Sequence, residues 1–282
     1  MSFAQAIVIA IIQGVTELFP ISSLGHAVVL PALFWPNIDL RSPAFLPFLV
    51  VLHLGTAVAL LAYFWRDWWE LIVGVFRGGK AADGENRRRL LALIVAATVP
   101  AVVLGFAFEK QLKALFGEPK AAAAFLIANG FLLAIGEILR KRSLASNVPS
   151  DKPDRLSFAG AIAVGVWQCL AFFPGISRSG ATMVGGLLAK LTHEQAARFS
   201  FLLATPVIVG AAVLEVPKLL RGAATEQIMP ISTIAVSGVV AGIAAYLSVA
   251  FLMRYFRRHD FAALYPFAIY CIVFGAISLA VL

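Results

Sequence analysis

The chain has 282 residues, of which 61% are hydrophobic and only 13% charged, and its mean hydropathy is +0.89. Soluble domains are nearer half apolar and a quarter charged, so this composition excludes an ordinary soluble protein and indicates a polytopic membrane protein. The net charge of +8 comes from short basic clusters between apolar stretches, which is typical of cytoplasmic loops and gives no support to nucleic-acid binding.

The N-terminal stretch, residues 1–12, is apolar, but it runs directly into Gln13 and Glu17 and has no Lys or Arg before it. It therefore does not have the pattern of a cleavable signal peptide. Cys169 and Cys271 lie in apolar stretches, which predicts no disulfide framework. Six later stretches have the roughly 20 apolar residues that a bilayer crossing requires. These predicted spans are residues 44–65, 89–108, 120–139, 196–215, 229–253 and 261–281.

The loops between the predicted spans alternate between rich and poor in Lys and Arg. The rich loops are residues 66–89, 140–157 and 254–260. The poor loops hold Lys110, Lys113 and Lys120 in one case, and Lys218 and Arg221 in the other. Because cytoplasmic loops carry the excess of basic residues, we predict that the rich loops lie in the cytoplasm.

Two remaining segments, residues 1–43 and 157–195, are each broken in the middle by Pro and Gly. With the basic loops inside, each segment must enter and leave on one side, which predicts a re-entrant helix hairpin. The expected fold is an all-α polytopic membrane protein with an inverted-topology repeat, each half having one re-entrant hairpin plus three transmembrane helices. A single integral membrane domain would cover residues 1–282, with halves at about 1–143 and 157–282, and the two breaks would meet near the midplane.

The alternative is that residues 4–19 or 157–173 form simple spans. Each stretch is short and ends in a polar break, and crossing by only one of them would disturb the alternation of loop charge. The hairpin interpretation places the mouth of the first hairpin outside, so the site is expected to open to the outer side of the membrane.

The first break carries a carboxylate, two hydroxyls and an imidazole. Gln13 and Glu17 are neighbours on one helix face, and a lone Glu in an apolar helix needs a partner, a proton or a metal. Ser22 and Ser23 are favoured at helix N-caps, where free N–H groups bind anions, and His26 can share their face. Glu17 is expected to be a general base or a ligand for a hard divalent cation. The structural alternatives are a neutral Glu bonded to a neighbouring helix and a core histidine.

The second break supplies a cation. Arg178 stands between Ser177 and Ser179, and its planar fork is suited to phosphate oxygens. Gly180 allows close backbone approach, and Thr182 adds another hydroxyl. Together the two breaks predict an oxyanion pocket that holds a phosphate. The structural alternative is an Arg178 that pairs with the first break's carboxylate.

These residues resemble the undecaprenyl-diphosphate phosphatase family, also called the bacitracin-resistance family. Its first motif, (Glu/Gln)-x-x-x-Glu followed by Pro-x-Ser-Ser-x-Gly-His, is matched from Gln13 to His26. Its second motif, Pro-Gly-x-Ser-Arg-Ser-Gly-Ala-Thr, is matched from Pro174 to Thr182, and the resemblance extends through residues 196–203. Leu24 replaces a small polar residue that is often found before the Gly-His pair, and we expect little effect from it.

The resemblance implies hydrolysis of a C55 polyprenyl diphosphate to its monophosphate and inorganic phosphate, which recycles the lipid carrier for cell-wall synthesis. It also implies a divalent cation, Mg or Ca, held by Glu17 and Gln13, although Gln13 stands where some members have a second carboxylate. Arg178 and the metal would neutralise charge on the diphosphate. Ser23 is the expected nucleophile, with His26 or Glu17 taking its proton. His26 as nucleophile and direct attack by metal-bound water remain open.

The resemblance also implies the bacterial plasma membrane as the location and a polyprenyl diphosphate lipid as the partner. A homodimer is compatible with the sequence but is not required by it. The main rival function is a flippase for the monophosphate lipid, because inverted repeats with broken helices are a transporter architecture. A phosphatidic-acid-type phosphatase is disfavoured, since no Arg-Pro dipeptide of its motif occurs in the chain.

Overall fold

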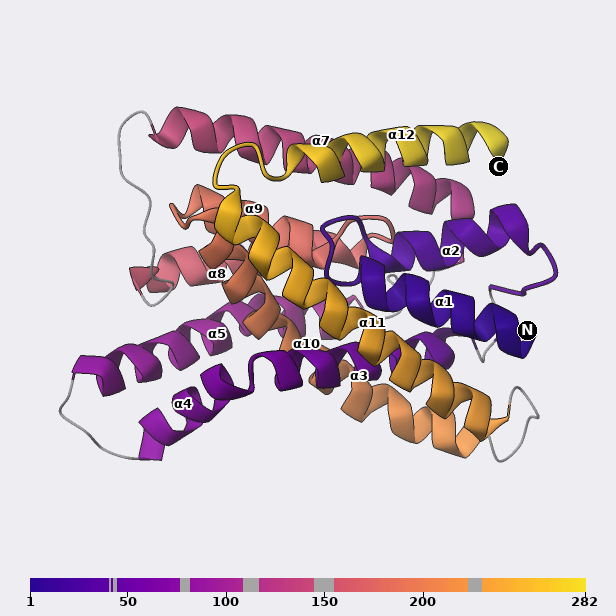
Figure 1. Ribbon diagram of the computed structural model, residues 1–282, viewed down its shortest axis with the longest axis horizontal. Coiled ribbons are helices and arrows are strands. Elements are labelled where there is room, and N and C mark those ends of the chain that lie inside the picture. Colours follow the sequence, from indigo (N-terminus) through magenta and orange to yellow (C-terminus); the bar gives the residue numbers. More distant parts are fainter. Residues whose placement is uncertain (41, 43–44, 77–81, 109–116, 145–154, 223–229) are drawn as a thin grey trace.

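The computed structural model describes residues 1–282 except 41, 43–44, 77–81, 109–116, 145–154 and 223–229. The described part of the chain is built from helices (Figure 1). They are α1 (Phe3–Thr16), α2 (Ser23–Phe34), α3 (Phe45–Tyr63), α4 (Trp65–Phe76), α5 (Ala82–Ala107), α7 (Pro119–Leu144), α8 (Phe158–Gln168), the 3₁₀ turn η2 (Cys169–Phe172), α9 (Arg178–Leu188), α10 (His193–Gly222), α11 (Ile231–Arg258) and α12 (Tyr265–Val281). The predicted loop residues Arg77, Lys80, Lys110, Lys113 and Lys152 lie outside the described residues.

Four of the predicted spans are confirmed as helices long and apolar enough to cross a bilayer, namely α5, α7, α10 and α11. The outer face of α5 shows why: Val95, Val99 and Val103 recur one turn apart and are exposed, as a lipid-facing surface requires. Two predictions differ in detail. The helix α12 has 17 residues and is therefore shorter than a typical span, and α3 meets α4 at a bend of 72°.

The prediction of a loop over residues 66–89 was wrong at both ends, because residues 65–76 form α4 and residues 82–89 belong to α5, while residues 77–81 lie outside the described residues. The charged residues of α4 led to the loop prediction, although α4 is an amphipathic helix. Leu71 is buried and Trp68 packs against the core, while Asp67 pairs with Arg198 of α10. A short helix with one apolar and one charged face is suited to a membrane interface.

Helices of the two halves approach each other closely at small residues. A Cβ on Gly14 of α1 would lie 2.3 Å from the carbonyl oxygen of Ala241 in α11. A Cβ on Gly165 of α8 would lie equally close, at 2.3 Å, to the carbonyl oxygen of Ala97 in α5. Small residues at such contacts let helix backbones pack without the hydrophobic driving force that water provides. These two glycines therefore allow α1 to pack closely against α11 and α8 to pack closely against α5.

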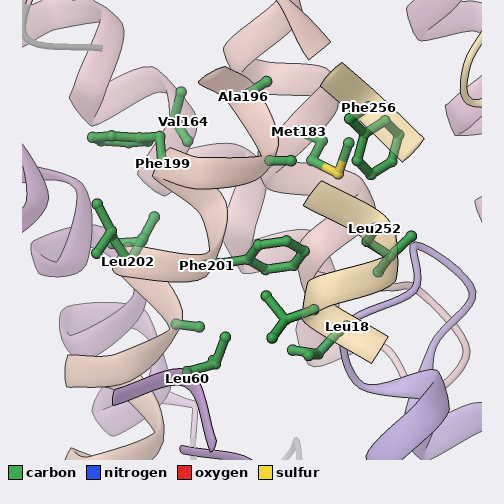
Figure 2. Close-up of a cluster of buried hydrophobic side chains, with 14 of the residues drawn as sticks. Leu18, Leu60, Val164, Met183, Ala196, Phe199, Phe201, Leu202, Leu252 and Phe256 are labelled. Carbon is green, nitrogen blue, oxygen red and sulfur yellow. The ribbon is translucent and has the colours of Figure 1, made fainter. Parts of the chain in front are cut away.

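The core is centred on α10. Figure 2 shows Phe199, Phe201 and Leu202 of α10 surrounded by side chains from several other helices. Those neighbours include Leu60 of α3, Val164 of α8, Met183 of α9, and Leu252 and Phe256 of α11. The central helix thus packs against α9 of the second hairpin and against α3, α5 and α11.

A buried ionic cluster joins α7, α10 and the segment before α12. His193 Nε2 lies 2.7 Å from Glu137 Oε1, and Arg140 Nη2 donates to Asp260 Oδ1 at 2.9 Å. Burial raises the pKa of Asp260, but the His193 backbone N–H and the Arg140 charge outweigh it and hold this pKa below its ordinary value. Each charge in the cluster has a partner, as buried charges require.

The hairpin arms are short helices that meet at the centre of the molecule. α1 packs on α2, and both reach inward from the end of the molecule that carries the chain termini (Figure 1). α8 and α9 also pack on each other and reach inward from the opposite end. The irregular segments between the arms, at residues 17–22 and 173–177, therefore come together inside the helix bundle.

Candidate active site

Both breaks end in the same capping arrangement. Ser22 caps α2, and its Oγ accepts a hydrogen bond from the Gly25 N–H at 3.2 Å. Ser177 caps α9, and its Oγ accepts from the Gly180 N–H at 3.1 Å. A serine N-cap satisfies an N–H that would otherwise be buried without a partner at the start of the helix. The predicted role of Ser22 as a cap is confirmed.

Two residues of the breaks adopt left-handed backbone conformations. Ser22 has φ of 69°, which is uncommon for a residue other than glycine, and such strain is often found at functional sites. Gly175 has φ of 117°, and a Cβ there would lie 2.4 Å from the Ala122 carbonyl oxygen. The second break therefore requires glycine for its conformation and for its close approach to α7.

Asn129 of α7 links the two breaks, a role that the sequence analysis did not foresee. Its Nδ2 donates to the Pro20 carbonyl at 2.9 Å, and its Oδ1 accepts from the Ser177 N–H at 3.0 Å. The Ser179 hydroxyl also donates across the junction, to the Phe19 carbonyl at 3.1 Å. The only signal in the sequence was a single amide inside the apolar span 120–139.

Glu17 is the centre of the site. Its Oε1 lies 3.0 Å from Arg178 Nη2, and the two side chains are only 7% and 12% exposed. Its Oε2 accepts from the Ser23 hydroxyl at 2.5 Å and from Gln13 Nε2 at 3.2 Å. The structure thus brings together four of the predicted residues. It also bears out the alternative in which Arg178 pairs with the carboxylate of the first break.

His53 of α3 is a second residue that the sequence analysis missed. Its Nε2 lies 3.3 Å from Glu17 Oε2, and its Nδ1 lies 2.7 Å from the Leu49 carbonyl oxygen. A carbonyl only accepts hydrogen bonds, so Nδ1 carries a proton, and Nε2 faces the carboxylate favourably only with a proton between them. The signal available was one imidazole inside the predicted span 44–65.

His26 occupies a different environment from the one expected. Its Nδ1 lies 2.7 Å from the Ser22 carbonyl oxygen, and its Nε2 lies 2.8 Å from the Tyr270 hydroxyl. The ring is buried and stacks on Phe274 at 4.9 Å between centroids. Both ring nitrogens therefore have partners other than Ser23, and the predicted role of His26 as base or nucleophile stays a prediction.

The other predicted phosphate-binding residues hold the second break in shape. The Ser177 hydroxyl lies 3.0 Å from the Ser179 hydroxyl, and the Thr182 hydroxyl lies 2.6 Å from the Ser200 hydroxyl. Gly180 packs against Pro20 of the first break. Of these residues, Ser177 lines the cavity described next. Direct contact of any of the four with a phosphate stays a prediction.

A cavity of about 270 Å³ opens beside the Glu17–Arg178 pair. Its polar side consists of Glu17, Ser22, Ser23, His53, Gln168, Ser177 and Arg178. Its other side is apolar and is formed by Leu24, Leu49, Val50, Ala101, Ala171, Phe172, Ile176, Val207, Ile208 and Ala211. A cavity with one charged side and one long apolar side is suited to a molecule with an anionic head and a hydrocarbon chain.

The described residues contain no cluster of three or more His, Cys, Asp or Glu that could hold a metal on their own. Gln13 is nevertheless buried, and its Oε1 has no hydrogen-bond partner among the described residues. Because Mg²⁺ is usually held by one or two carboxylates together with phosphate oxygens, Glu17 and Gln13 fit a site that substrate oxygens complete.

Known proteins resemble this chain along its whole length. Residues 6–277 match the family described as bacitracin resistance protein BacA. An undecaprenyl-diphosphatase of Acidiphilium cryptum is 55% identical, over 97% of this chain and 96% of that protein. An undecaprenyl-diphosphatase of Granulibacter bethesdensis is 53% identical, over 99% and 97%. An undecaprenyl-diphosphatase 2 of Chromobacterium violaceum is 47% identical, over 99% and 98%. With its apolar helices and this match, the chain is a multi-pass membrane protein that belongs to the bacitracin resistance protein BacA family.

Proposed function

We propose that the protein hydrolyses undecaprenyl diphosphate to undecaprenyl phosphate and inorganic phosphate. The observation that carries the proposal is the cavity in which Ser23, Glu17 and Arg178 are held together beside apolar walls. Relatives that are named undecaprenyl-diphosphatase and match this chain over nearly their full length support the same substrate. The reaction recycles a lipid carrier for cell-wall synthesis and is expected to confer resistance to bacitracin.

Substrate binding begins with Arg178. In the ligand-free protein, one arm of its guanidinium neutralises Glu17. A diphosphate carries more negative charge than a carboxylate and offers oxygens spaced for the planar fork, so Arg178 turns toward it. The apolar side of the cavity, including Phe172 and Val207, then faces the first part of the polyprenyl chain.

This exchange of partners activates the nucleophile. Once Arg178 holds the diphosphate, Glu17 keeps His53 beside it but is no longer paired with the guanidinium, so it accepts the proton of Ser23, whose hydroxyl already points at it. Ser23 Oγ bonds to the terminal phosphorus, the bond from that phosphorus to the bridging oxygen breaks, and polyprenyl phosphate leaves. Water then attacks the phosphoserine and releases inorganic phosphate, and the proton on Glu17 returns to Ser23. His26 supports the Ser22 carbonyl in this scheme.

A divalent cation is part of the proposal. Glu17 and the free Oε1 of Gln13 would hold it together with diphosphate oxygens. When bound, Mg or Ca neutralises charge that develops on the phosphoryl oxygens.

We also propose that the two halves form an inverted repeat whose site opens to the outer side of a bacterial plasma membrane. The packing of the helices supports this. The contact of α1 with α11 in one direction corresponds to the contact of α8 with α5 in the other, and the corresponding helices α3 and α10, and α7 and α12, pack on each other. Matching serine caps at Ser22 and Ser177 support it as well. The same architecture fits a flippase. Phosphate release must therefore be measured with detergent-solubilised protein, because transport across a membrane cannot occur there.

The first prediction concerns Arg178. Detergent-solubilised protein with Mg or Ca is expected to release phosphate from undecaprenyl diphosphate, and Arg178→Ala should lower kcat/KM by at least about 100-fold. Arg178→Lys should retain part of the activity, since it keeps the charge but loses the fork. Arg257→Ala, which alters an exposed arginine paired with Glu194, is the matched control. Full activity in Arg178→Ala would rule out this site, and no release by the wild type would favour transport.

The second prediction compares adjacent serines. Ser23→Ala should abolish phosphate release because it removes the attacking oxygen. Ser22→Ala should cost roughly 1 kcal/mol of stability through loss of the cap but should leave the nucleophile in place. Rapid quenching followed by mass spectrometry should find phosphate on Ser23. Phosphate found on His26 would make that residue the nucleophile, and a reaction with no phosphorylated protein would indicate direct attack by water.

The third prediction concerns the metal. Chelation should lower activity, and addition of Mg or Ca should restore it. Gln13→Glu places a second carboxylate beside Glu17 and should reduce the metal concentration needed for half-maximal activity. Gln13→Leu removes an oxygen ligand and should increase that concentration. Activity that does not respond to chelation in any of these proteins would contradict the proposed metal site.

The fourth prediction tests the orientation. In a variant without Cys169 and Cys271, single cysteines are introduced at the exposed positions Asn37 and Lys141. A membrane-impermeant maleimide should label Asn37→Cys in intact cells, and Lys141→Cys only after permeabilisation, because Lys141, in the last turn of α7, belongs to the basic stretch that is proposed to lie in the cytoplasm. The reverse pattern would place the first hairpin on the cytoplasmic side.

A further inference from the structure

Gln168 is a buried amide whose polar atoms have no protein partner. The residue is 2% exposed, and neither its Oε1 nor its Nε2 has a hydrogen-bond partner within the described part of the chain. Buried side-chain amides nearly always have partners, because an unpaired donor or acceptor loses its bonds to water without replacing them. Where such a group also lines a cavity, it indicates a partner that arrives from outside the protein.

The position of Gln168 shows where that partner must be. It is the last residue of α8, directly before η2, and it lines the same cavity as Ser23 and Arg178. The apolar residues Ala171 and Phe172 continue the cavity wall on the same turn. An amide between a cationic side and an apolar wall is at the boundary where the head of an amphiphilic anion meets its chain.

The first hairpin explains why Gln168 lacks a partner. Gln13 precedes Ser22 by the same spacing that separates Gln168 from Ser177, so the two glutamines occupy equivalent positions. Gln13 Nε2 donates to Glu17, four residues further on. The residue four positions after Gln168 is Phe172, which offers no acceptor. The second hairpin thus keeps the amide donor but has no carboxylate to bind it.

We infer that Gln168 is a substrate-contacting residue that donates a hydrogen bond from its amide to a non-bridging oxygen of the diphosphate. This inference rests on the proposed function. The neutral amide adds a donor beside Arg178 without adding positive charge, so it strengthens binding of the diphosphate head without creating a second strong cation to retain inorganic phosphate. Its position next to Phe172 points to the phosphate nearer the polyprenyl chain.

The test compares Gln168→Met with wild type. Methionine has nearly the same length and shape but cannot donate a hydrogen bond, and it replaces a poorly satisfied amide with an apolar group. We expect KM for undecaprenyl diphosphate to rise about ten-fold, as loss of one hydrogen bond to a charged oxygen predicts. The melting temperature of the ligand-free protein should stay unchanged or rise. A structural role would instead lower the melting temperature and leave KM unchanged.

The matched control is Gln195→Met in α10. Gln195 Oε1 is also buried without a partner among the described residues, but Gln195 is not part of the cavity lining. This variant should keep the wild-type KM. A second variant, Gln168→Glu, keeps the shape but places a negative charge beside the diphosphate, and it should raise KM more than Gln168→Met does.

Each outcome separates this inference from the function on which it rests. Failure of wild type and Gln195→Met to release phosphate would overturn the proposed function and, with it, this inference. Active wild type together with a KM within two-fold of wild type in either Gln168 variant would overturn the inference alone. If Gln168→Met does not fold, Gln168→Glu decides by its KM.

Discussion

The structure depends on one ion pair, between Glu17 in the first break and Arg178 in the second. His53 also lies beside the carboxylate, but removing either partner of such a buried pair costs about 3–5 kcal/mol. The pair therefore holds two segments from opposite halves of the chain at one point. In the proposed mechanism, substrate binding separates this same contact.

Around this pair, the protein satisfies a backbone that has left helical geometry. Asn129 bonds to both breaks, and Ser179 binds the Phe19 carbonyl. Buried backbone groups outside a helix need hydrogen-bond partners, and these side chains supply them. Several hydroxyls of the two breaks therefore bond to the backbone, whereas the Ser23 hydroxyl donates to the Glu17 carboxylate. The unpaired amide of Gln168 is an exception to this rule, which is why it is informative.

Much of the fold followed from the sequence, and the failures have physical causes. Long apolar stretches predicted α5, α7, α10 and α11, because a continuous apolar run of about 20 residues is long enough to cross a bilayer as a helix. The helix α4 was missed because its charged residues lie on one face of an amphipathic helix, and charge density alone cannot distinguish such a helix from a loop.

Seven charged or polar side chains line a single cavity, although they come from segments that are far apart in the sequence.

By itself, the sequence determined that the chain is a membrane protein, that it has two polar breaks, and that these breaks carry Glu17, Ser23 and Arg178. Those conclusions rest on local composition and on the high cost of polar groups in lipid. Only the tertiary structure decided which groups touch. It placed His53 beside Glu17, directed His26 toward Tyr270, and put Gln168 in the cavity lining, where its amide has no partner among the described residues. The reason is that the sequence of a helix shows which residues share a face. Which side chains that face contacts depends on how α3, α7 and α12 pack against the breaks.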